Sequence, residues 1–353
     1  MKSKVIAIDP QYPDLGKIAY CAKIIRQGGL VVFPTETVYG VAVDNSNLQA
    51  VKRLREVKKR AEEKPFSVLI AQIGLISNYT SMNSPLLYKL IDTYWPGPLT
   101  VVVPAKESGT IGVRMPDHPI ALRLVQESQC TIAAPSANFE GNPAPVTCEE
   151  ALRDLDGLVD VAIDGGPAKI GKSSSVVDLT QDSPVVLREG AVTLDDVNKL
   201  TKTRIILFVC TGNSCRSVMA EYVLKSMTAH RDDVEILSAG TSVFFRTSAS
   251  AETISVLREE GIDAAEHLSQ PLTSIMLKKS DLIIAMTRSH REQILERVPE
   301  VEKRVYLLKE FVNIPPGLHI DLDVPDPIGR SHQAYKECLA IIKEAVHKIV
   351  ELI

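Results

Sequence analysis

The sequence is poor in aromatic residues and has no long apolar run. Aromatic residues make up 5% of the 353 residues, whereas hydrophobic residues as a class reach 45% and charged residues 24%. This balance is typical of soluble globular proteins, and the length favours two domains of roughly 100–200 residues each. No apolar run approaches the ~18 residues of a membrane-spanning helix. We therefore expect no membrane partner.

The cysteines and the charge exclude further classes of protein. The six cysteines form no C-x-x-C pair and no Cys/His cluster with zinc spacing, so no metal site is predicted. Six cysteines in a chain of this length do not indicate a disulfide scaffold. The N-terminal segment MKSKVIAIDPQYPD does not fit a signal peptide, so we expect a reduced, cytoplasmic protein. The net charge of −4 restricts any nucleic-acid contact to a local patch.

The second half of the chain alternates regularly between buried strands and amphipathic helices. The pattern predicts strands at 204–210, 234–240, 281–287 and 304–308, and helices at 217–227, 249–261, 288–298 and 331–353. Such alternation is typical of a parallel sheet with helices on both faces. We therefore predict an α/β fold with a four-stranded parallel sheet flanked by helices.

The first half is also α/β, but its pattern is less regular and predicts a mixed, twisted sheet with helices. The expected strands lie at 30–35, 67–71, 99–104 and 176–180, and the expected helices at 16–29, 48–60 and 86–95. A strand and turn near 190 give way to a short polar stretch that ends near 203. That change predicts two domains, residues 1–198 and 203–353.

One segment of the second half, RIILFVCTGNSCRSVMAEY, suits phosphate chemistry. Cys210 and Arg216 enclose five residues between a buried strand and a helix. The amides of such a loop bind anions, and the planar fork of Arg216 holds phosphate oxygens. The positive environment favours the thiolate of Cys210, which then attacks phosphorus. We expect Gly212 to permit the tight turn, and Asn213 and Ser217 to hold the loop and the thiolate by hydrogen bonds.

A proton donor for the leaving group is expected at Asp326. This residue lies between two prolines in DLDVPDPIGR, on a loop after the last strand. At the carboxyl end of a parallel sheet it would serve as general acid and then as general base. The residues alone leave two plainer interpretations open. Cys210 could be a buried cysteine that ends a core strand, and Asp326 could be a turn aspartate before proline.

Residues 204–353 resemble the low-molecular-weight protein phosphatases, whose signature V-C-x-G-N-x-C-R-S and later Asp-Pro both occur here. The resemblance implies that Cys210 is the nucleophile, Arg216 the phosphate clamp and Asp326 the general acid, acting on a phosphoprotein. It also implies that Cys215 pairs with Cys210 under oxidation. The remaining residues of the implied phosphate loop are Thr211, Gly212, Asn213, Ser214, Cys215 and Ser217.

Three residues depart from the tyrosine-specific members of that family. Ser214 stands where those members carry a bulky aliphatic residue, and Ile328 and Gly329 stand where they usually carry tyrosine. Ser214 more closely resembles the threonine of the bacterial protein-arginine phosphatases. The resemblance therefore favours phosphoarginine as the substrate, with phosphotyrosine as the alternative.

The first half carries small hydroxyl residues and glycines beside repeated lone cations. These occur in FPTETVYG, REVKKRAEEKP, TIGVRMPDHP, TIAAPSANFEGNP and GKSSSVVDLT. The combination suits a phosphate-bearing ligand plus a small polar one, with catalysis by orientation and charge neutralisation. Two alternatives stay open: Lys58, Lys59 and Arg60 as a solvated helix end, and Ser136 and Asn138 as turn residues. Residues 166–173 fit the Walker A pattern, but a predicted strand follows, which argues against a P-loop.

Residues 8–195 resemble the YrdC family of threonylcarbamoyl-AMP synthases. The motifs PTETVYG, K-x-R, WPGPLT, GVRMPDHP, APSAN and SSVVD…LREG stand in order. The resemblance implies formation of threonylcarbamoyl-AMP from L-threonine, bicarbonate and ATP, with Mg²⁺ on the phosphates, for use in tRNA modification. The partners it implies are L-threonine, bicarbonate, ATP, and tRNA or tRNA-modification proteins downstream.

The same resemblance assigns site residues. Thr35, Arg114 and Ser174 would face threonine, with Arg114 on its carboxylate. The implied ATP site consists of Lys58, Arg60, Thr110, Ser136, Asn138 and Arg188. Ala61 replaces the usual proline after the K-x-R arginine. Longer family members carry a different C-terminal domain, where this chain has the phosphatase-like half.

Two alternatives to a bifunctional enzyme stay open. The first half could bind RNA or nucleotide without catalysis, beside an inert phosphoprotein reader. The first half could also act on another carbamoylated or adenylated substrate.

Overall fold

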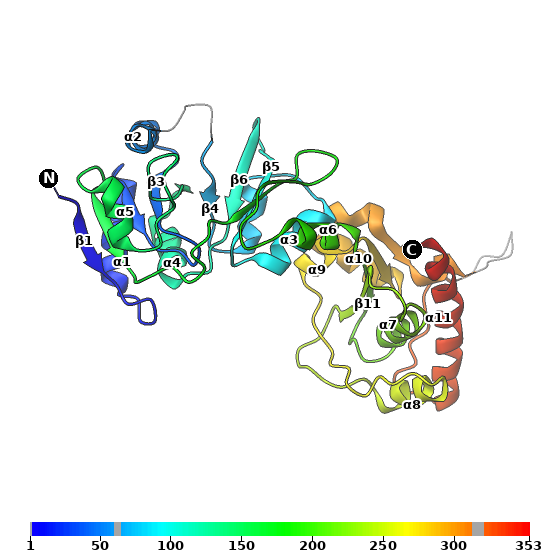
Figure 1. The fold of residues 1–353 in the computed structure, drawn as a ribbon. Helices are drawn as coiled ribbons and strands as arrows, with labels where there is room; N and C mark the ends of the chain where they lie inside the picture. Colours follow the sequence, from blue (N-terminus) through cyan, green and yellow to red (C-terminus); the bar gives the residue numbers. More distant parts are fainter. Residues whose placement is uncertain (1, 60–64, 313–320) are drawn as a thin grey trace. The chain divides into compact units, whose positions relative to one another are not determined.

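The computed structural model describes residues 2–59, 65–312 and 321–353 (Figure 1). Contacts divide the chain into two units, one formed by residues 1–82 and 89–198, the other by residues 83–88 and 199–353. Within the described residues, the first unit holds a ten-stranded mixed sheet and the second a four-stranded sheet. The predicted fold class is therefore confirmed for both halves.

The sheet of the first unit mixes parallel and antiparallel neighbours. β1 pairs in parallel with β8, β8 with β2, β4 with β6 and β5 with β9, and the remaining neighbours are antiparallel. In spatial order the strands are β1 (Lys4–Ala7), β8 (Val161–Asp164), β2 (Val31–Phe33), β3 (Gly40–Asp44), β7 (Ile132–Ala133), β4 (Val68–Leu69), β6 (Thr110–Arg114), β5 (Leu99–Pro104), β9 (Ser175–Asp178) and β10 (Val185–Arg188).

Helices cover both faces of this sheet because side chains along a strand alternate between faces. Val31 and Phe33 of β2 pack with α1 (Leu15–Arg26) and α4 (Pro119–Ser128). Val32, between them, packs on the other face with α2 (Leu48–Lys58) and α5 (Cys148–Leu155). The unit also contains η1 (Ile73–Asn78) and residues of α3 (Pro85–Tyr94).

The polar stretch that we expected to mark the domain boundary forms a helix, α6 (Leu194–Lys202). Val197 is its buried anchor. Asp195 and Asp196 occupy its first turn, and Lys199 and Lys202 its last, so the charges complement the helix dipole. A helix of nine residues spans too few turns for its apolar spacing to stand out in a sequence.

The second unit has the predicted parallel sheet. Its order is β12 (Val234–Gly240), β11 (Arg204–Cys210), β13 (Leu282–Ala285) and β14 (Val305–Leu307), and every neighbouring pair is parallel. The helices are α7 (Arg216–Met227), α8 (Ala251–Glu259), α9 (Ser274–Lys279), α10 (Arg288–Arg297) and α11 (His332–Leu352), with η2 (Pro299–Arg304) and η3 (Leu308–Phe311).

Strand alternation again sorts the helices of this unit. Phe208 of β11 packs into the core formed with α7, α8 and α11, whereas its neighbours Leu207 and Val209 pack toward α9 and α10. Helices α7 and α11 lie side by side in Figure 1, and their contacts agree. Because β11 and β13 are neighbouring parallel strands, their carboxyl ends are adjacent, and the loops that follow them meet at one edge of the sheet.

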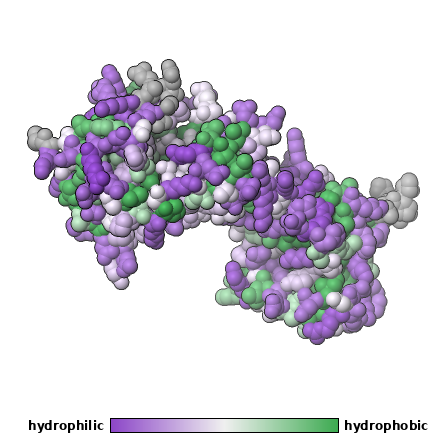
Figure 2. Space-filling view, in the orientation of Figure 1, coloured by the Kyte–Doolittle hydropathy of each residue, from purple (hydrophilic) through white to green (hydrophobic). Residues whose placement is uncertain are grey.

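Most of the surface visible in Figure 2 is hydrophilic, interrupted by separate hydrophobic patches. In the part of the chain that the structure describes, no helix combines the length and the apolar composition that crossing a membrane requires.

Candidate active sites

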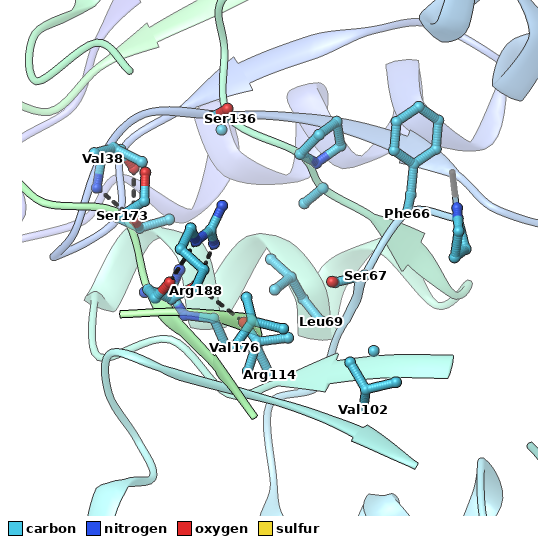
Figure 3. A pocket seen from close by; sticks show the side chains of 18 of the residues that line it. Val38, Phe66, Ser67, Leu69, Val102, Arg114, Ser136, Ser173, Val176 and Arg188 are labelled. Carbon is cyan, nitrogen blue, oxygen red and sulfur yellow. Dashed lines mark hydrogen bonds between the residues drawn. The ribbon is translucent and has the colours of Figure 1, made fainter. Parts of the chain in front are cut away.

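The first unit contains a cavity of about 310 Å³ above strands β4, β5, β6 and β9 (Figure 3). Of the nine residues predicted for threonine and ATP, six line it, namely Thr35, Thr110, Arg114, Ser136, Ser174 and Arg188. Ser136 lies across the cavity from Arg114 in Figure 3. The motifs that supply these residues are far apart in the sequence, and the sheet brings them together.

Arg114 ends β6 and is buried against a carboxylate. Its Nη2 donates to Glu36 Oε1 over 2.6 Å and to Thr37 Oγ1 over 2.8 Å, and its Nε donates to the Gly97 carbonyl over 3.2 Å. Burial lowers the pKa of Arg114, and the adjacent Glu36 opposes that shift. The guanidinium is thus held rigidly by protein groups at the wall of the cavity.

Thr35 lies in the buried loop that joins β2 and β3. Its Oγ1 donates to the Val38 carbonyl over 2.5 Å and lies 2.9 Å from Thr37 Oγ1. Short hydroxyl side chains close such turns by bonding to the nearby backbone. The loop conformation therefore holds Thr35 against Thr37, which in turn accepts a hydrogen bond from Arg114.

Arg188 ends β10 and reaches over the start of β9. Its Nε donates to the Ser174 carbonyl over 2.9 Å, and its Nη2 contacts Ser174 Oγ at 3.1 Å. Thr100 Oγ1 lies 3.0 Å from the same Ser174 hydroxyl. Ser174, predicted for threonine, and Arg188, predicted for ATP, are thus parts of one hydrogen-bonded group.

Lys58 and Asn138 do not line the cavity but lie behind Ser136. Lys58 is 2% exposed, and its Nζ donates to the Ser136 carbonyl over 2.5 Å and to the Asn138 carbonyl over 2.6 Å. Lys58 is therefore not the solvated helix end that was one alternative. The remaining predicted ATP residue, Arg60, and Ala61 beside it lie outside the described residues.

The segment with the Walker A pattern is a loop fixed to the cavity wall. Gly166 and Gly171 have positive φ angles, and strand β9 follows the segment, as predicted. The Ile170 and Gly171 amides donate to the carbonyls of Glu36 and Thr37. Since no helix follows the glycines, the segment lacks the helix N-terminus that a P-loop needs.

In the second unit, Cys210 ends β11 and is 3% exposed. Its Sγ lies 2.9 Å from Ser217 Oγ and accepts a hydrogen bond from the Asn213 amide over 3.3 Å. The left-handed residue of the loop is Asn213, with a φ of 50°, and not Gly212, to which we had assigned the tight turn. Asn tolerates this conformation better than most residues.

Asn213 also connects the loop to a buried polar chain. Its Nδ2 donates to Ser217 Oγ over 3.1 Å and to Ser238 Oγ over 2.6 Å. Ser238 in turn donates to the buried carboxylate of Glu221, and His267 Nε2 lies 3.0 Å from the Asn213 carbonyl. The chain runs from Glu221 to the sulfur of Cys210, so it fixes the loop from within.

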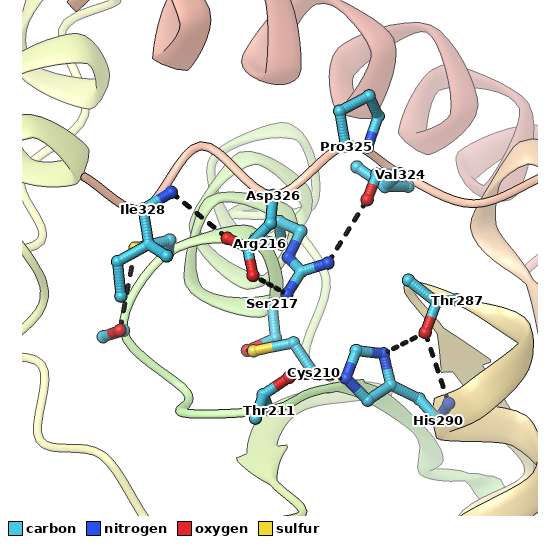
Figure 4. A network of polar contacts seen from close by, with 12 residues as sticks. Cys210, Thr211, Arg216, Ser217, Thr287, His290, Val324, Pro325, Asp326 and Ile328 are labelled. Atoms are coloured by element: carbon cyan, nitrogen blue, oxygen red, sulfur yellow. Dashed lines mark hydrogen bonds and ion pairs between the residues drawn. The ribbon is translucent and has the colours of Figure 1, made fainter. Parts of the chain in front are cut away.

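Arg216 begins α7 and faces the loop of Asp326 (Figure 4). Its Nη1 donates to the Val324 carbonyl over 3.2 Å, and its Nη2 donates to Asp326 Oδ2 over 2.6 Å. The Ile328 amide donates to the other oxygen of Asp326 over 3.2 Å. The structure thus brings together the three residues predicted for catalysis, Cys210, Arg216 and Asp326.

The loop also has a contact on its outer side. Thr211 Oγ1 lies 2.8 Å from Nε2 of His290, a residue in the first turn of α10. His290 Nδ1 lies 2.8 Å from Thr287 Oγ1. Burial, and then Arg216, lower the pKa of His290 to about 4, while Asp323 and Asp326 oppose the shift.

All six cysteines are free thiols. Cys210 and Cys215 belong to the same buried cluster, and Cys215 Sγ lies 3.4 Å from Ser250 Oγ and 3.7 Å from the Tyr335 hydroxyl. Ser214 is partly buried, and Ile328, which follows the Asp-Pro pair, is 62% exposed.

Sequence reasoning missed several residues of both sites. In the first unit these are Glu36 and Thr37, which stand in a recognised motif but had no assigned role. In the second they are Glu221, Ser238, His267, Thr287 and His290. Ser238, His267 and His290 lie far from Cys210 in the sequence, so no local spacing marks them.

The geometry is that of an α/β protein with two candidate sites. One is a cavity lined by polar and apolar side chains, and the other is a loop that begins with a buried cysteine. Residues 23–190 match the Sua5/YciO/YrdC family model, described as telomere recombination, and residues 205–353 match the model of low molecular weight phosphotyrosine protein phosphatase. The chain belongs to the Sua5/YciO/YrdC family through its first half and to the low-molecular-weight phosphatase family through its second.

Individual relatives agree for the first half. The threonylcarbamoyl-AMP synthase of Bacillus subtilis is 40% identical over 199 residues, which cover 54% of this chain and 56% of the relative. A Mycobacterium tuberculosis protein, provisionally named for the same activity, is 36% identical over 54% of this chain and 90% of its own length. This chain spans about half the length of the first curated relatives, at 56%, 57% and 49%.

A solved structure is also similar. The crystal structure of Pyrococcus abyssi Sua5 complexed with L-threonine is 25% identical, with a TM-score of 0.54, over 86% of this chain and 99% of that one.

Proposed function

We propose that the chain is a bifunctional enzyme, a threonylcarbamoyl-AMP synthase followed by a cysteine-dependent protein phosphatase. The observation that carries the first activity is the cavity in which Arg114, Ser174 and Arg188 meet. The observation that carries the second is the loop from Cys210 to Arg216, whose arginine is hydrogen-bonded to Asp326. Family membership and the named relatives support the assignment of each half.

In the synthase reaction, the amino group of threonine and bicarbonate form a carbamate with loss of water. A carbamate oxygen then attacks the α-phosphorus of ATP, and pyrophosphate leaves. We assign the threonine carboxylate to Arg114, because a rigidly held guanidinium binds carboxylates with two parallel hydrogen bonds. Thr35 and Ser174 lie at the same cavity wall, and the related Pyrococcus protein has been crystallised with L-threonine.

We assign the ATP phosphates to Arg188, Thr110 and Ser136, which line the same cavity as the proposed threonine residues. Lys58 holds the carbonyls of Ser136 and Asn138, so its charge stands directly behind Ser136. These groups neutralise the charge of the polyphosphate and orient it, and both effects accelerate the attack of the carbamate oxygen on the α-phosphorus. Arg60, which lies outside the described residues, stays a predicted member of the site.

The protein offers no dedicated cage for Mg²⁺ in its described residues, where no group of three His, Cys, Asp or Glu could hold a metal ion. Mg²⁺ is typically held by substrate phosphates and water with only one or two carboxylates. We therefore regard the ion as a companion of ATP and assign it no protein ligand. The adenylate product would then serve tRNA or tRNA-modification proteins.

In the phosphatase reaction, the thiolate of Cys210 attacks phosphorus and the bond to the leaving group breaks. Asp326 supplies the proton that the leaving atom needs, and Arg216 holds the transferring oxygens. A water molecule, deprotonated by Asp326, then attacks the phosphorus, the S–P bond breaks, and phosphate leaves with the Cys210 thiolate and the protonated Asp326 restored. Because the nucleophile must stay a free thiol, we place the chain in the reducing cytoplasm.

We favour phosphoarginine over phosphotyrosine as the residue that is dephosphorylated. Ser214 is small and partly buried, and Ile328 and Gly329 follow the Asp-Pro pair, so neither position supplies an aromatic wall. A serine hydroxyl next to the bound phosphoryl group suits the N–H groups of a guanidine better than a phenyl ring. Phosphoarginine and phosphotyrosine peptides of one sequence, compared by kcat/KM, distinguish the two.

Assays of both reactions distinguish the bifunctional enzyme from the alternative that both halves only bind their ligands. Purified protein given ATP, bicarbonate and L-threonine should form threonylcarbamoyl-AMP, detected by mass spectrometry. The same preparation should hydrolyse 4-nitrophenyl phosphate, and Cys210→Ser should abolish only that reaction. Binding of either ligand without turnover in the wild-type protein would support the alternative.

A further inference from the structure

The outer edge of the phosphate loop is held by a hydrogen-bonded chain that the proposed mechanism does not use. Thr287 and Thr211 follow the neighbouring strands β13 and β11, and His290 lies between them (Figure 4). Each of the two ring nitrogens is 2.8 Å from one threonine hydroxyl. His290 is 4% exposed, so water does not compete for its ring.

The direction of each hydrogen bond follows from the donors and acceptors available. Thr287 Oγ1 already accepts a hydrogen bond from the His290 amide over 3.3 Å, as the N-cap of α10. Within the described part of the chain, its hydroxyl makes no other contact than that with His290 Nδ1. Among the described residues Nδ1 is the acceptor in contact with this hydroxyl, and we place the hydroxyl proton on that bond.

A neutral imidazole that accepts at Nδ1 carries its proton at Nε2. Nε2 then donates to Thr211 Oγ1, and the hydroxyl of Thr211 can donate its own proton to another acceptor. Thr211 is exposed, and among the described residues its hydroxyl contacts only His290. The low pKa of His290, about 4, agrees with a neutral ring at physiological pH.

We infer that His290 is a positioning residue that orients the Thr211 hydroxyl to donate a hydrogen bond to a phosphoryl oxygen bound at the loop. The inference rests on the proposed phosphatase function and adds a substrate contact to it. Thr211 immediately follows Cys210, the residue that we propose attacks phosphorus, in the same loop. The donor complements Arg216, which approaches the same anion from the start of α7.

Substitutions at the two residues test the chain kinetically. Thr211→Val and His290→Gln should each raise the inhibition constant of inorganic phosphate and lower kcat/KM for 4-nitrophenyl phosphate by about tenfold, as loss of one charge-assisted hydrogen bond does. The double variant should lose about tenfold and not a hundredfold, because both changes remove the same contact. Thr211→Ser keeps the hydroxyl and should restore activity.

Nuclear magnetic resonance tests the same chain without turnover. The nitrogen chemical shifts of the His290 ring, assigned by their loss in His290→Gln, should show protonation at Nε2 and an unprotonated Nδ1. Protonation at Nδ1 instead would overturn the inference. So would wild-type phosphate affinity and kcat/KM in Thr211→Val and His290→Gln.

Thermal midpoints close to that of the wild type confirm that both variants fold. If the wild-type protein itself shows no turnover that depends on Cys210, the proposed phosphatase function fails. The tautomer and the phosphate affinity still decide whether His290 orients Thr211 toward an anion.

Discussion

Arg216 Nη2 donates a hydrogen bond to Asp326 Oδ2 over 2.6 Å, so the proposed phosphate clamp and the proposed proton donor are bound to each other. The side chain of Arg216 is 7% exposed and that of Asp326 is 44% exposed. The arginine is therefore the fixed partner and the aspartate the accessible one. In the proposed mechanism, a phosphate dianion bound at the loop would offer Arg216 a second, doubly charged acceptor, and the carboxyl group of Asp326 would then face the leaving atom.

This geometry predicts that the effect of Asp326→Asn depends on the leaving group. General acid catalysis contributes roughly 10²–10⁴-fold, and it matters most where the leaving group is a poor one. We expect a small loss with 4-nitrophenyl phosphate and the full loss with phenyl phosphate, both measured as kcat/KM. Equal losses with the two substrates would contradict a proton-donor role for Asp326.

The buried pair of Arg114 and Glu36 predicts a stability signature in the first unit. Removal of one partner of a buried ion pair leaves an uncompensated charge and costs roughly 3–5 kcal/mol. Arg114→Ala should thus lower the thermal midpoint, and the double variant with Glu36→Gln should recover part of the loss. Neither variant should bind L-threonine in calorimetry. Threonine binding by the double variant would show that Arg114 is structural only.

Gly240, the last residue of β12, packs so closely against the phosphate loop that we expect any side chain there to disturb the loop. A Cβ atom added there would lie 2.5 Å from the Thr211 carbonyl oxygen and 3.0 Å from the Asn213 nitrogen. Both contacts are with backbone, so Gly240→Ala must displace the loop. We expect weaker phosphate binding and lower kcat. Gly261→Ala, where nothing lies within 4 Å of the added Cβ but φ is positive, controls for backbone strain alone.

Two buried histidines, His118 at the N-cap of α4 and His290 in α10, make the stability of the folded state depend on pH. Burial lowers the pKa values of His118 and His290 to about 4, from an ordinary 6.5. Between those values the unfolded chain binds protons that the folded chain does not, so stability falls as the pH drops from 6.5 toward 4. Calorimetric midpoints should be lower at pH 5 than at pH 7. His118→Asn, which keeps a good N-cap residue, and His290→Gln should each reduce this difference. An unchanged difference in both variants would contradict the assignment.

The sequence predicted the second unit better than the first because its signal is local. The run from Arg204 to Cys210 is a continuous apolar strand, and the residues that bind phosphate follow it within one loop and one helical turn. The first unit assembles its cavity partly from residues that follow strands as short as β7 (Ile132–Ala133), in which no period can be read and which the sequence pattern did not predict. Family motifs identified Arg114 and Ser174, where periodicity did not.

The buried partners of the catalytic residues could not be predicted from local patterns. His290 is separated from Thr211 by 79 positions, and Ser238 from Asn213 by 25. The loop after β11 meets the start of α10 and strand β12 because β11 lies between β13 and β12 in the sheet, and the connections between such parallel strands vary in length. The turn at Asn213 was assigned to Gly212 because glycine is the usual left-handed residue, whereas here the asparagine side chain is itself needed for the buried chain.

The central claim is that one chain holds two separate active sites, and pyrophosphate release tests it most directly. The wild-type protein, Cys210→Ser and the Arg114→Ala/Glu36→Gln double variant are each given ATP and bicarbonate, with and without L-threonine. The account predicts threonine-dependent release by the wild type and by Cys210→Ser, and none by the double variant. Release that does not depend on threonine, or no release by a folded wild-type protein, would contradict it.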